Sequence, residues 1–102
     1  MTDLELTKLC ADAMGYKAEP HPNRILGTKL MWVANNGNWN PLIDDAQAMA
    51  LVKKFVLRIN RNRGMPEKWA VNSRRNYEDI QLSDDLNRAI CQCVANMQKA
   101  KP

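Results

Sequence analysis

The stretch 83–97, SDDLNRAICQCVANM, predicts an amphipathic helix near the end of the chain. Its apolar residues recur at steps of three and four, which is the spacing of one face of an α-helix. They are Leu86, Ile90, Cys93, Val94 and Met97. Ser83 is expected to cap this helix by accepting a backbone N–H of the first turn. A helix with one apolar face has to pack on another layer, which the preceding residues must supply.

Short strands are expected in front of this helix. Residues 68–72 alternate, with Trp69 and Val71 on one face, and residues 77–82 alternate as well. The residues between them have the composition of a hairpin loop. A third strand is expected at 29–34, an apolar run that is followed by an Asn-Gly step typical of tight turns. We therefore expect a small sheet built from strands near 29–34 and 67–72.

Two further helices are expected upstream. Thr2 and Glu5 form a capping-box pair, and Gly15 suits the left-handed residue that ends a helix, which predicts a helix over 3–14. A second helix is predicted over roughly 43–59, with Asp44 and Asp45 in its first turn, where the helix dipole favours negative charge. Residues 17–28, which hold two prolines and a glycine, are expected to form an irregular connection.

This order of elements predicts a protein of the mixed α/β (α+β) class. The expected architecture is a small three-layer α/β/α sandwich, with three helices around a short sheet. A length of 102 residues predicts a single α/β domain over 1–102, with a frayed tail at about 99–102.

The composition favours a cytoplasmic protein without a membrane span. No run approaches the roughly 18 consecutive apolar residues of a membrane helix, and the acidic start lacks the layout of a secretory signal. The number of cysteines is three, whereas a small secreted fold would use an even set as disulfides. Reduced thiols in a cytosol are therefore expected.

No motif of the sequence indicates catalysis, and we expect neither a metal nor a cofactor. Cys91 and Cys93 point about 200° apart on a helix and cannot share one ion. The single histidine, His21, lies between two prolines and is expected to be a solvated side chain rather than a catalytic base. The acidic pairs at 44–45 and 84–85 open helices, so capping explains them better than acid/base chemistry or Mg²⁺ binding. The protein is predicted not to be an enzyme.

The charge is unevenly distributed along the chain. Residues 53–75 carry eight Lys and Arg residues against Glu67 alone, although the whole chain has a net charge of only +4. Such a segment suits nucleic-acid phosphates, and Trp69 and Tyr77 could add stacking surfaces. The candidate contacts are Arg58, Arg61, Arg63, Arg74 and Arg75. Against this hypothesis, charge runs are usually solvated faces, and Trp69 is better explained as a core residue of a strand.

Two tryptophans, Trp32 and Trp39, flank the Asn-Gly turn and allow two interpretations. They close the core beneath the turn, or they form part of a docking surface for a protein partner, since tryptophan is enriched at interface hot spots.

Three segments resemble the phage ABA sandwich domain family, a small three-layer α/β/α module of tailed phages and prophages. The first helix ends in Met14-Gly15-Tyr16, which is similar to the Met-Gly-aromatic step of that family. Trp39-Asn40-Pro41 followed by an Ala-rich helix resembles its second-helix entry, and Ala89-Ile90-Cys91 its third helix. The chain differs from the family at Leu42-Ile43, where small hydroxyl residues are usual, and in its basic loop.

The resemblance implies a fold and a phage origin, and it carries no activity. The leading hypothesis is a non-catalytic phage or prophage accessory or protein-interaction module in the host bacterial cytoplasm. Its partner would be an unknown phage or host protein, with no membrane involved. The alternative is a weak nucleic-acid-binding protein that uses the basic segment 53–75.

Overall fold

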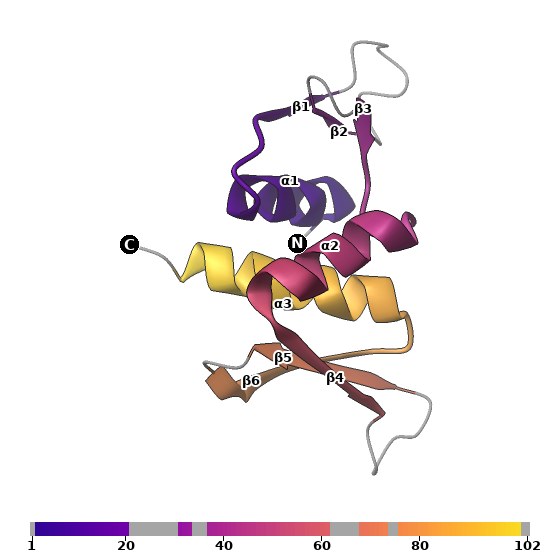
Figure 1. The fold of residues 1–102 in the computed structure, drawn as a ribbon, viewed down its shortest axis with the longest axis vertical. Coiled ribbons are helices and arrows are strands. Elements are labelled where there is room, and N and C mark those ends of the chain that lie inside the picture. The colour runs from indigo at the N-terminus through magenta and orange to yellow at the C-terminus, as the bar shows by residue number, and fades with distance from the viewer. Residues whose placement is uncertain (1, 21–30, 34–36, 62–67, 74–75, 101–102) are drawn as a thin grey trace.

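The computed structural model describes residues 2–20, 31–33, 37–61, 68–73 and 76–100, and their order along the chain mixes helices with short strands (Figure 1). The helices are α1 (Asp3–Ala13), α2 (Asp45–Phe55) and α3 (Leu86–Lys99). The first antiparallel sheet contains β1 (Ala18–Pro20), β2 (Met31–Val33) and β3 (Gly37–Trp39). The second antiparallel sheet contains β4 (Leu57–Arg61), β5 (Trp69–Ser73) and β6 (Asn76–Ser83).

The helices lie between the two sheets (Figure 1). The first sheet covers α1, α3 lies between α1 and the second sheet, and α2 packs beside α3. Three helices with antiparallel strands confirm the predicted mixed α/β class. The layer order differs from the expected one, because β2 and β5 belong to different sheets. Each strand pairs with its neighbours along the chain, so two local sheets enclose the helices where one shared sheet was expected.

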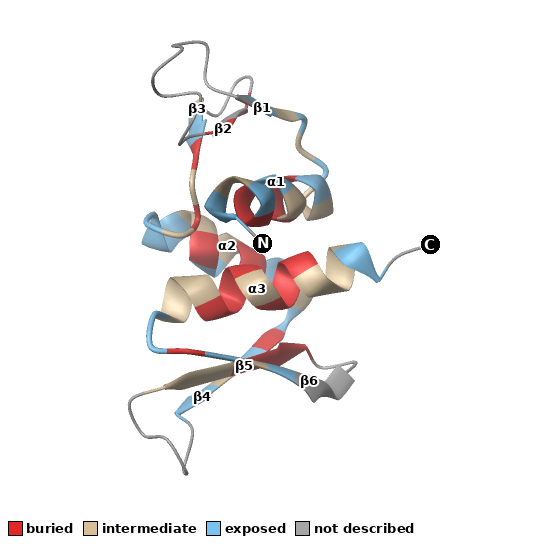
Figure 2. Ribbon diagram, turned by 180° about the vertical axis from the view of Figure 1, so that it is seen from behind, coloured by how far each residue is buried: buried red, intermediate tan, exposed pale blue. Residues whose placement is uncertain are grey.

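Helix α3 is the most buried element of the core (Figure 2). At 100° per residue, its buried side chains span roughly 240° of the helix circumference. They are Ala89, Ile90, Cys91, Cys93, Val94 and Ala95. This arc faces three neighbours, since α3 packs against α1, α2 and the second sheet. A helix with a single narrow apolar stripe could pack against one such neighbour, whereas the wide apolar arc of α3 packs against all three.

The boundaries of α1 follow the predicted signals. The Thr2 side chain accepts the Glu5 N–H at 3.1 Å, as the capping-box pair predicts. Gly15 has a φ of 80°, and the Tyr16 N–H reaches back to the Ala11 carbonyl at 2.9 Å. The helix ends there because glycine enters the left-handed region without a steric penalty.

The predicted helix over 43–59 is shorter than expected and ends in a strand. Asp44 caps α2 by accepting the Gln47 N–H, and Val56 terminates the helix in a left-handed conformation with a φ of 51°. The next residue, Leu57, opens β4. The prediction was wrong at this end because Leu57 and Ile59 fit both a helical stripe and a strand alternation. These residues form a strand because β4 pairs with β5 along its full length.

Other elements were predicted with mixed success. The expected strands over 68–72 and 77–82 are confirmed as β5 and β6. Of the strand expected over 29–34, residues 31–33 form β2, and residues 29, 30 and 34 lie outside the described residues. The connection over 17–28 contains a strand, β1, that the sequence analysis missed. The predicted cap of α3 was also wrong: Asp85 accepts the Arg88 N–H at 3.3 Å, and the Ser83 hydroxyl accepts the Asp85 N–H at 3.1 Å.

Replacing Val56 by glycine should stabilise the protein. A left-handed conformation costs an L-residue about 1–2 kcal/mol, whereas glycine loses about 0.5–1 kcal/mol more conformational entropy on folding. Val56 is 55% exposed, so its side chain contributes little burial. Val56→Gly should raise the free energy of unfolding in urea by up to about 1 kcal/mol. The control Val52→Gly lies inside α2 and should lower the free energy of unfolding. If both variants lowered the free energy of unfolding by a similar amount, the left-handed conformation of Val56 would not be the source of strain.

Candidate functional site

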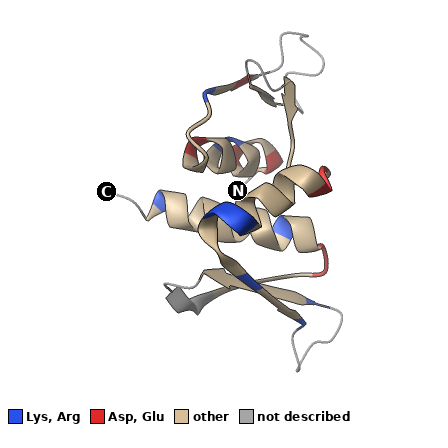
Figure 3. Cartoon of the chain, in the orientation of Figure 1, with Lys and Arg blue, Asp and Glu red and all other residues tan. Residues whose placement is uncertain are grey.

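Five cations of the described residues lie on consecutive elements of the chain and are called the basic stripe; the lysine and arginine positions are blue in Figure 3. They are Lys53, Lys54, Arg58, Arg61 and Lys68. The first two occupy the last turn of α2, the next two lie on β4, and the last precedes β5. The abrupt passage from α2 into β4 at Val56 places the two lysines next to the two arginines. Arg58 and Arg61 are three residues apart on β4 and therefore lie on opposite faces of the second sheet, so the basic stripe is divided between these two faces.

The second sheet has a buried and a solvent-facing side. Leu57 and Val71 are 8% and 0% exposed and face the helices. On the other side, the outer face, one cross-strand row consists of Asn60, Ala70 and Leu82. Arg58 and Ile80 lie on this same side, because residues two apart on a strand share a face. In Figures 1 and 2 no helix covers the outer face.

Two aliphatic side chains stand out on the outer face. Ile80 is 50% exposed and Leu82 is 43% exposed. The sequence carried a signal for them, since the alternation in 77–82 puts Ile80 and Leu82 on one face of the strand. The alternation could not say which face of the sheet would meet the helices, so this apolar pair was missed as a candidate site.

The guanidinium of Arg61 stacks on Trp69. Its Cζ atom lies 4.5 Å from the centre of the Trp69 ring, as in a cation–π contact. Trp69 is half-buried, which partly agrees with its predicted place in the core. Since Arg61 already covers the ring, Trp69 does not offer an open platform for a nucleic-acid base.

Several predicted residues fall outside this site. Arg63, Arg74, Arg75 and His21 lie outside the described residues. The predicted contacts that the structure does place, Arg58 and Arg61, are both exposed on β4.

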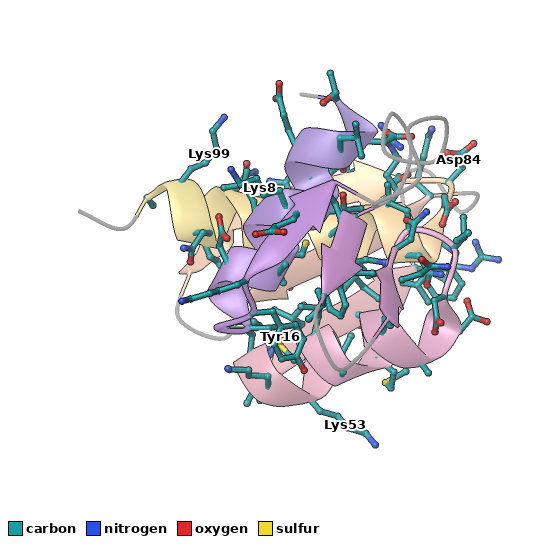
Figure 4. All side chains as sticks on the ribbon, turned by 90° about the horizontal axis from the view of Figure 1, so that it is seen from above. Lys8, Tyr16, Lys53, Asp84 and Lys99 are labelled. Atoms are coloured by element: carbon teal, nitrogen blue, oxygen red, sulfur yellow. The ribbon has the colours of Figure 1, made fainter. Side chains whose placement is uncertain are left out.

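The two tryptophans of the first sheet differ in what the structure shows. Trp32 lies on β2, where its backbone is opposite Glu19 and Asn38. Trp39 is only 4% exposed, and its Nε1–H donates to the Thr7 carbonyl at 2.8 Å. Its ring meets Tyr16 edge to face, with centroids 5.3 Å apart; Tyr16 is labelled in Figure 4. The docking interpretation of Trp39 is therefore wrong, and this residue closes the core.

The cysteines form a packing contact between helices. The Cys10 thiol of α1 donates to the Cys91 carbonyl of α3 at 3.5 Å. Hydrogen bonding with the Cys10 side chain, together with burial, raises the pKa of the Cys91 thiol, which therefore stays protonated at neutral pH. A protonated, fully buried thiol is a poor nucleophile and a poor metal ligand. Within the described ranges, no three His, Cys, Asp or Glu side chains gather into a metal site.

The acidic pairs at the helix starts act as structural groups. Asp44 and Asp85 cap α2 and α3, as described above, and the Asp45 carboxylate accepts from Asn87 Nδ2 at 2.8 Å. These N-terminal turns border a hollow of about 360 Å³ that is also lined by Met49 and Ile90. The described residues that line it are Asp45, Ala48, Met49, Asp85, Leu86, Asn87 and Ile90, and neither histidine nor cysteine is among them.

Comparisons with known proteins found no counterpart: no family model, no curated protein and no solved structure matches the chain. Among the helices of the described ranges, none has the length and apolar character needed to cross a membrane.

Removing the indole N–H of Trp39 should destabilise the fold. Trp39→Phe deletes the buried hydrogen bond to the Thr7 carbonyl and leaves a small cavity, which should lower the free energy of unfolding by about 2 kcal/mol. The matched control is Trp69→Phe at a half-buried position, with an expected loss of less than about 1 kcal/mol. Urea unfolding measures both. An equal effect of the two variants would argue against the anchoring role of Trp39.

Proposed function

We propose that this chain is a non-catalytic interaction module that binds a protein partner through the outer face of its second sheet. The observation that carries the proposal is the exposed pair Ile80 and Leu82, which lies on an uncovered sheet face that also carries Arg58. An exposed apolar patch bordered by charge is typical of protein-binding surfaces.

The apolar pair supplies the binding energy in this proposal. Fully burying an isoleucine or leucine side chain is worth about 1.5–3 kcal/mol, and these two are already about half-buried, so each would contribute roughly 1 kcal/mol. Ala70 lies beside Leu82 in the same cross-strand row and leaves room for a partner side chain. Backbone hydrogen bonds of the sheet hold Ile80 and Leu82 at a fixed spacing, so binding a partner costs little conformational entropy.

The charge on this surface defines the partner. Arg58 lies on the outer face, and Lys53 and Lys54 lie in the last turn of α2, just before β4 begins. A partner with an apolar centre and an acidic rim would match this pattern, because opposite potentials guide association and exclude basic competitors. We therefore infer an acidic protein surface as the ligand.

Nucleic acid is the weaker candidate. The basic stripe supports it, since lysines and arginines in a row match a phosphate backbone. Single-strand binders also present open aromatic rings for the bases, however, and Arg61 covers Trp69. The large exposed apolar side chains described on the outer face, Ile80 and Leu82, are aliphatic and offer no aromatic ring to a base.

The biological setting proposed here is that of a phage or prophage accessory protein. The resemblance to the phage ABA sandwich domain family supports this origin, and with it a partner of phage or host origin in the bacterial cytoplasm. The use of Asp44 and Asp85 as helix caps supports a non-catalytic role, because these carboxylates already have structural partners.

The proposal predicts that one identified partner depends on the outer face. Proteins captured from phage-infected bacterial extract would be compared between the native chain, Ile80→Ser/Leu82→Ser, and the control Ile43→Ser. Ile43 is 76% exposed and belongs to the turn before α2, so the control matches the change in chemistry at another place. A partner that is reconstituted from pure components should bind the double variant at least about tenfold more weakly, since roughly 2 kcal/mol of apolar burial is lost.

Two results would contradict this function. One is that every reconstituted partner binds the Ile80→Ser/Leu82→Ser variant as tightly as the native chain. The other is binding to mixed-sequence DNA or RNA that weakens steeply with salt, together with a shallower salt dependence in Arg58→Ala/Arg61→Ala. The second result would move the function to nucleic acid.

A further inference from the structure

Helix α2 has a second exposed surface, the α2 stripe, that the proposed function does not use. Its inner side chains, Ala48 and Leu51, are buried, and the opposite side of the helix presents Ala46, Met49 and Lys53. Met49 is 45% exposed, although it lies in the middle of the helix. Ile43 precedes the helix and Val56 follows it, at 76% and 55% exposure, so exposed apolar side chains extend beyond both ends.

The charges of α2 are segregated to its two ends. Asp44 and Asp45 lie at the start, and Lys53 and Lys54 lie in the last turn. The helix dipole adds to this polarity, with partial positive charge at the first turn and partial negative charge at the last. A helix with acidic and basic ends is complementary to a copy of itself that runs in the opposite direction.

We propose that α2 packs antiparallel against α2 of a second copy of this chain, forming a twofold-symmetric dimer. In such a pairing the residues near the middle of the helix, Met49 and Ala50, meet their own counterparts at the axis. The lysine-bearing last turn of each copy then lies beside the acidic first turn of the other. Ala46 and Ala50 are small, which lets the two helices approach closely.

The surroundings of α2 leave space for a second helix. In Figure 1 α2 lies at the front of the molecule, and in Figure 4 Lys53 points away from the body of the protein. The carboxylate of Asp45 is held by Asn87 and the ammonium of Lys54 by the Met14 carbonyl at 3.3 Å, so both charges lie at defined places on the surface. Both groups are exposed and retain capacity for a further ion pair.

The expected dimer is weak. Helix α2 has 11 residues and is therefore about 16 Å long, which buries less than the roughly 800 Å² per partner of a standard stable interface. Association should depend on concentration and should weaken with salt, since the end-to-end charge contacts are exposed.

A charge exchange tests the pairing. Asp45→Lys removes the net negative charge of the first turn of α2, and Lys53→Glu/Lys54→Glu makes both ends acidic; the N-cap Asp44 is kept in each. Sedimentation velocity at low salt should show a concentration-dependent dimer for the native chain and about tenfold weaker dimerisation for each variant alone, because twofold symmetry doubles every contact. A 1:1 mixture of the two variants should recover association, as a heterodimer.

A further variant tests the dimer in case the charge variants fail to fold. Met49→Glu changes the centre of the α2 stripe without touching either charged end, and it should also abolish the dimer while the circular dichroism spectrum remains that of the native chain. The outer-face variant Ile80→Ser/Leu82→Ser should dimerise like the native chain, which separates this proposal from the proposed function. A native chain that stays monomeric up to millimolar concentration overturns the proposal, and so does a mixture that associates no better than its components.

Discussion

The fold depends on the burial of α3 on three sides. Its apolar arc spans roughly 240° and packs against α1, α2 and the second sheet at once. The sequence of this helix makes such packing possible because the arc contains the small residues Ala89, Ala95 and two cysteines next to the larger Ile90 and Val94. Small side chains let neighbouring elements approach, and the larger ones fill the space between them. Two short sheets, each too small to be stable alone, are thereby joined: the second packs on α3, and the first packs on α1, which in turn packs on α3.

Polar contacts also attach the first sheet and α1 to this core. The Trp39 N–H binds the carbonyl of Thr7 and so ties β3 to α1, while the salt bridge of 3.0 Å between Arg88 and Asp3 joins α3 to α1 at the surface. The buried contact matters more, because an exposed ion pair of this kind contributes well under about 1 kcal/mol. With the helices fixed in this way, the outer face of the second sheet and the outer side of α2 both carry exposed apolar side chains, Ile80 and Leu82 on the former and Met49 on the latter.

The sequence predicted the helices better than the strands. Caps and periodicity located α1 and α3 to within two residues at each end, because these signals are local: the Thr2 cap, the Gly15 stop and the stripe from Leu86 onward. The end of α2 was missed because the apolar residues after Val56 satisfy both a helical and a strand pattern. Only pairing with β5, a contact between distant residues, distinguishes the two.

The candidate site was predicted in part. The basic segment was visible as composition, and the structure distributes its described members over the last turn of α2, both faces of β4 and the residue before β5. The roles of the aromatic residues were not visible, because a tryptophan before a turn suits a core as well as an interface. The buried Trp39 and the covered Trp69 both reflect tertiary contacts. Ile80 and Leu82 were placed on one face of a strand, but their exposure depends on which side of the sheet meets α3.

Native-state thiol labelling can show whether α3 joins both sides of the molecule in one cooperative core. Cys91 contacts Cys10 of α1, and Cys93 lies about 200° further round the helix, toward the second sheet; all three are buried. Alkylation in increasing urea, read for each cysteine by mass spectrometry, gives the free energy of opening at each thiol. We expect Cys10, Cys91 and Cys93 to become reactive together, with the free energy of global unfolding. Earlier labelling of Cys93 alone would show that the second sheet separates independently and would contradict the account.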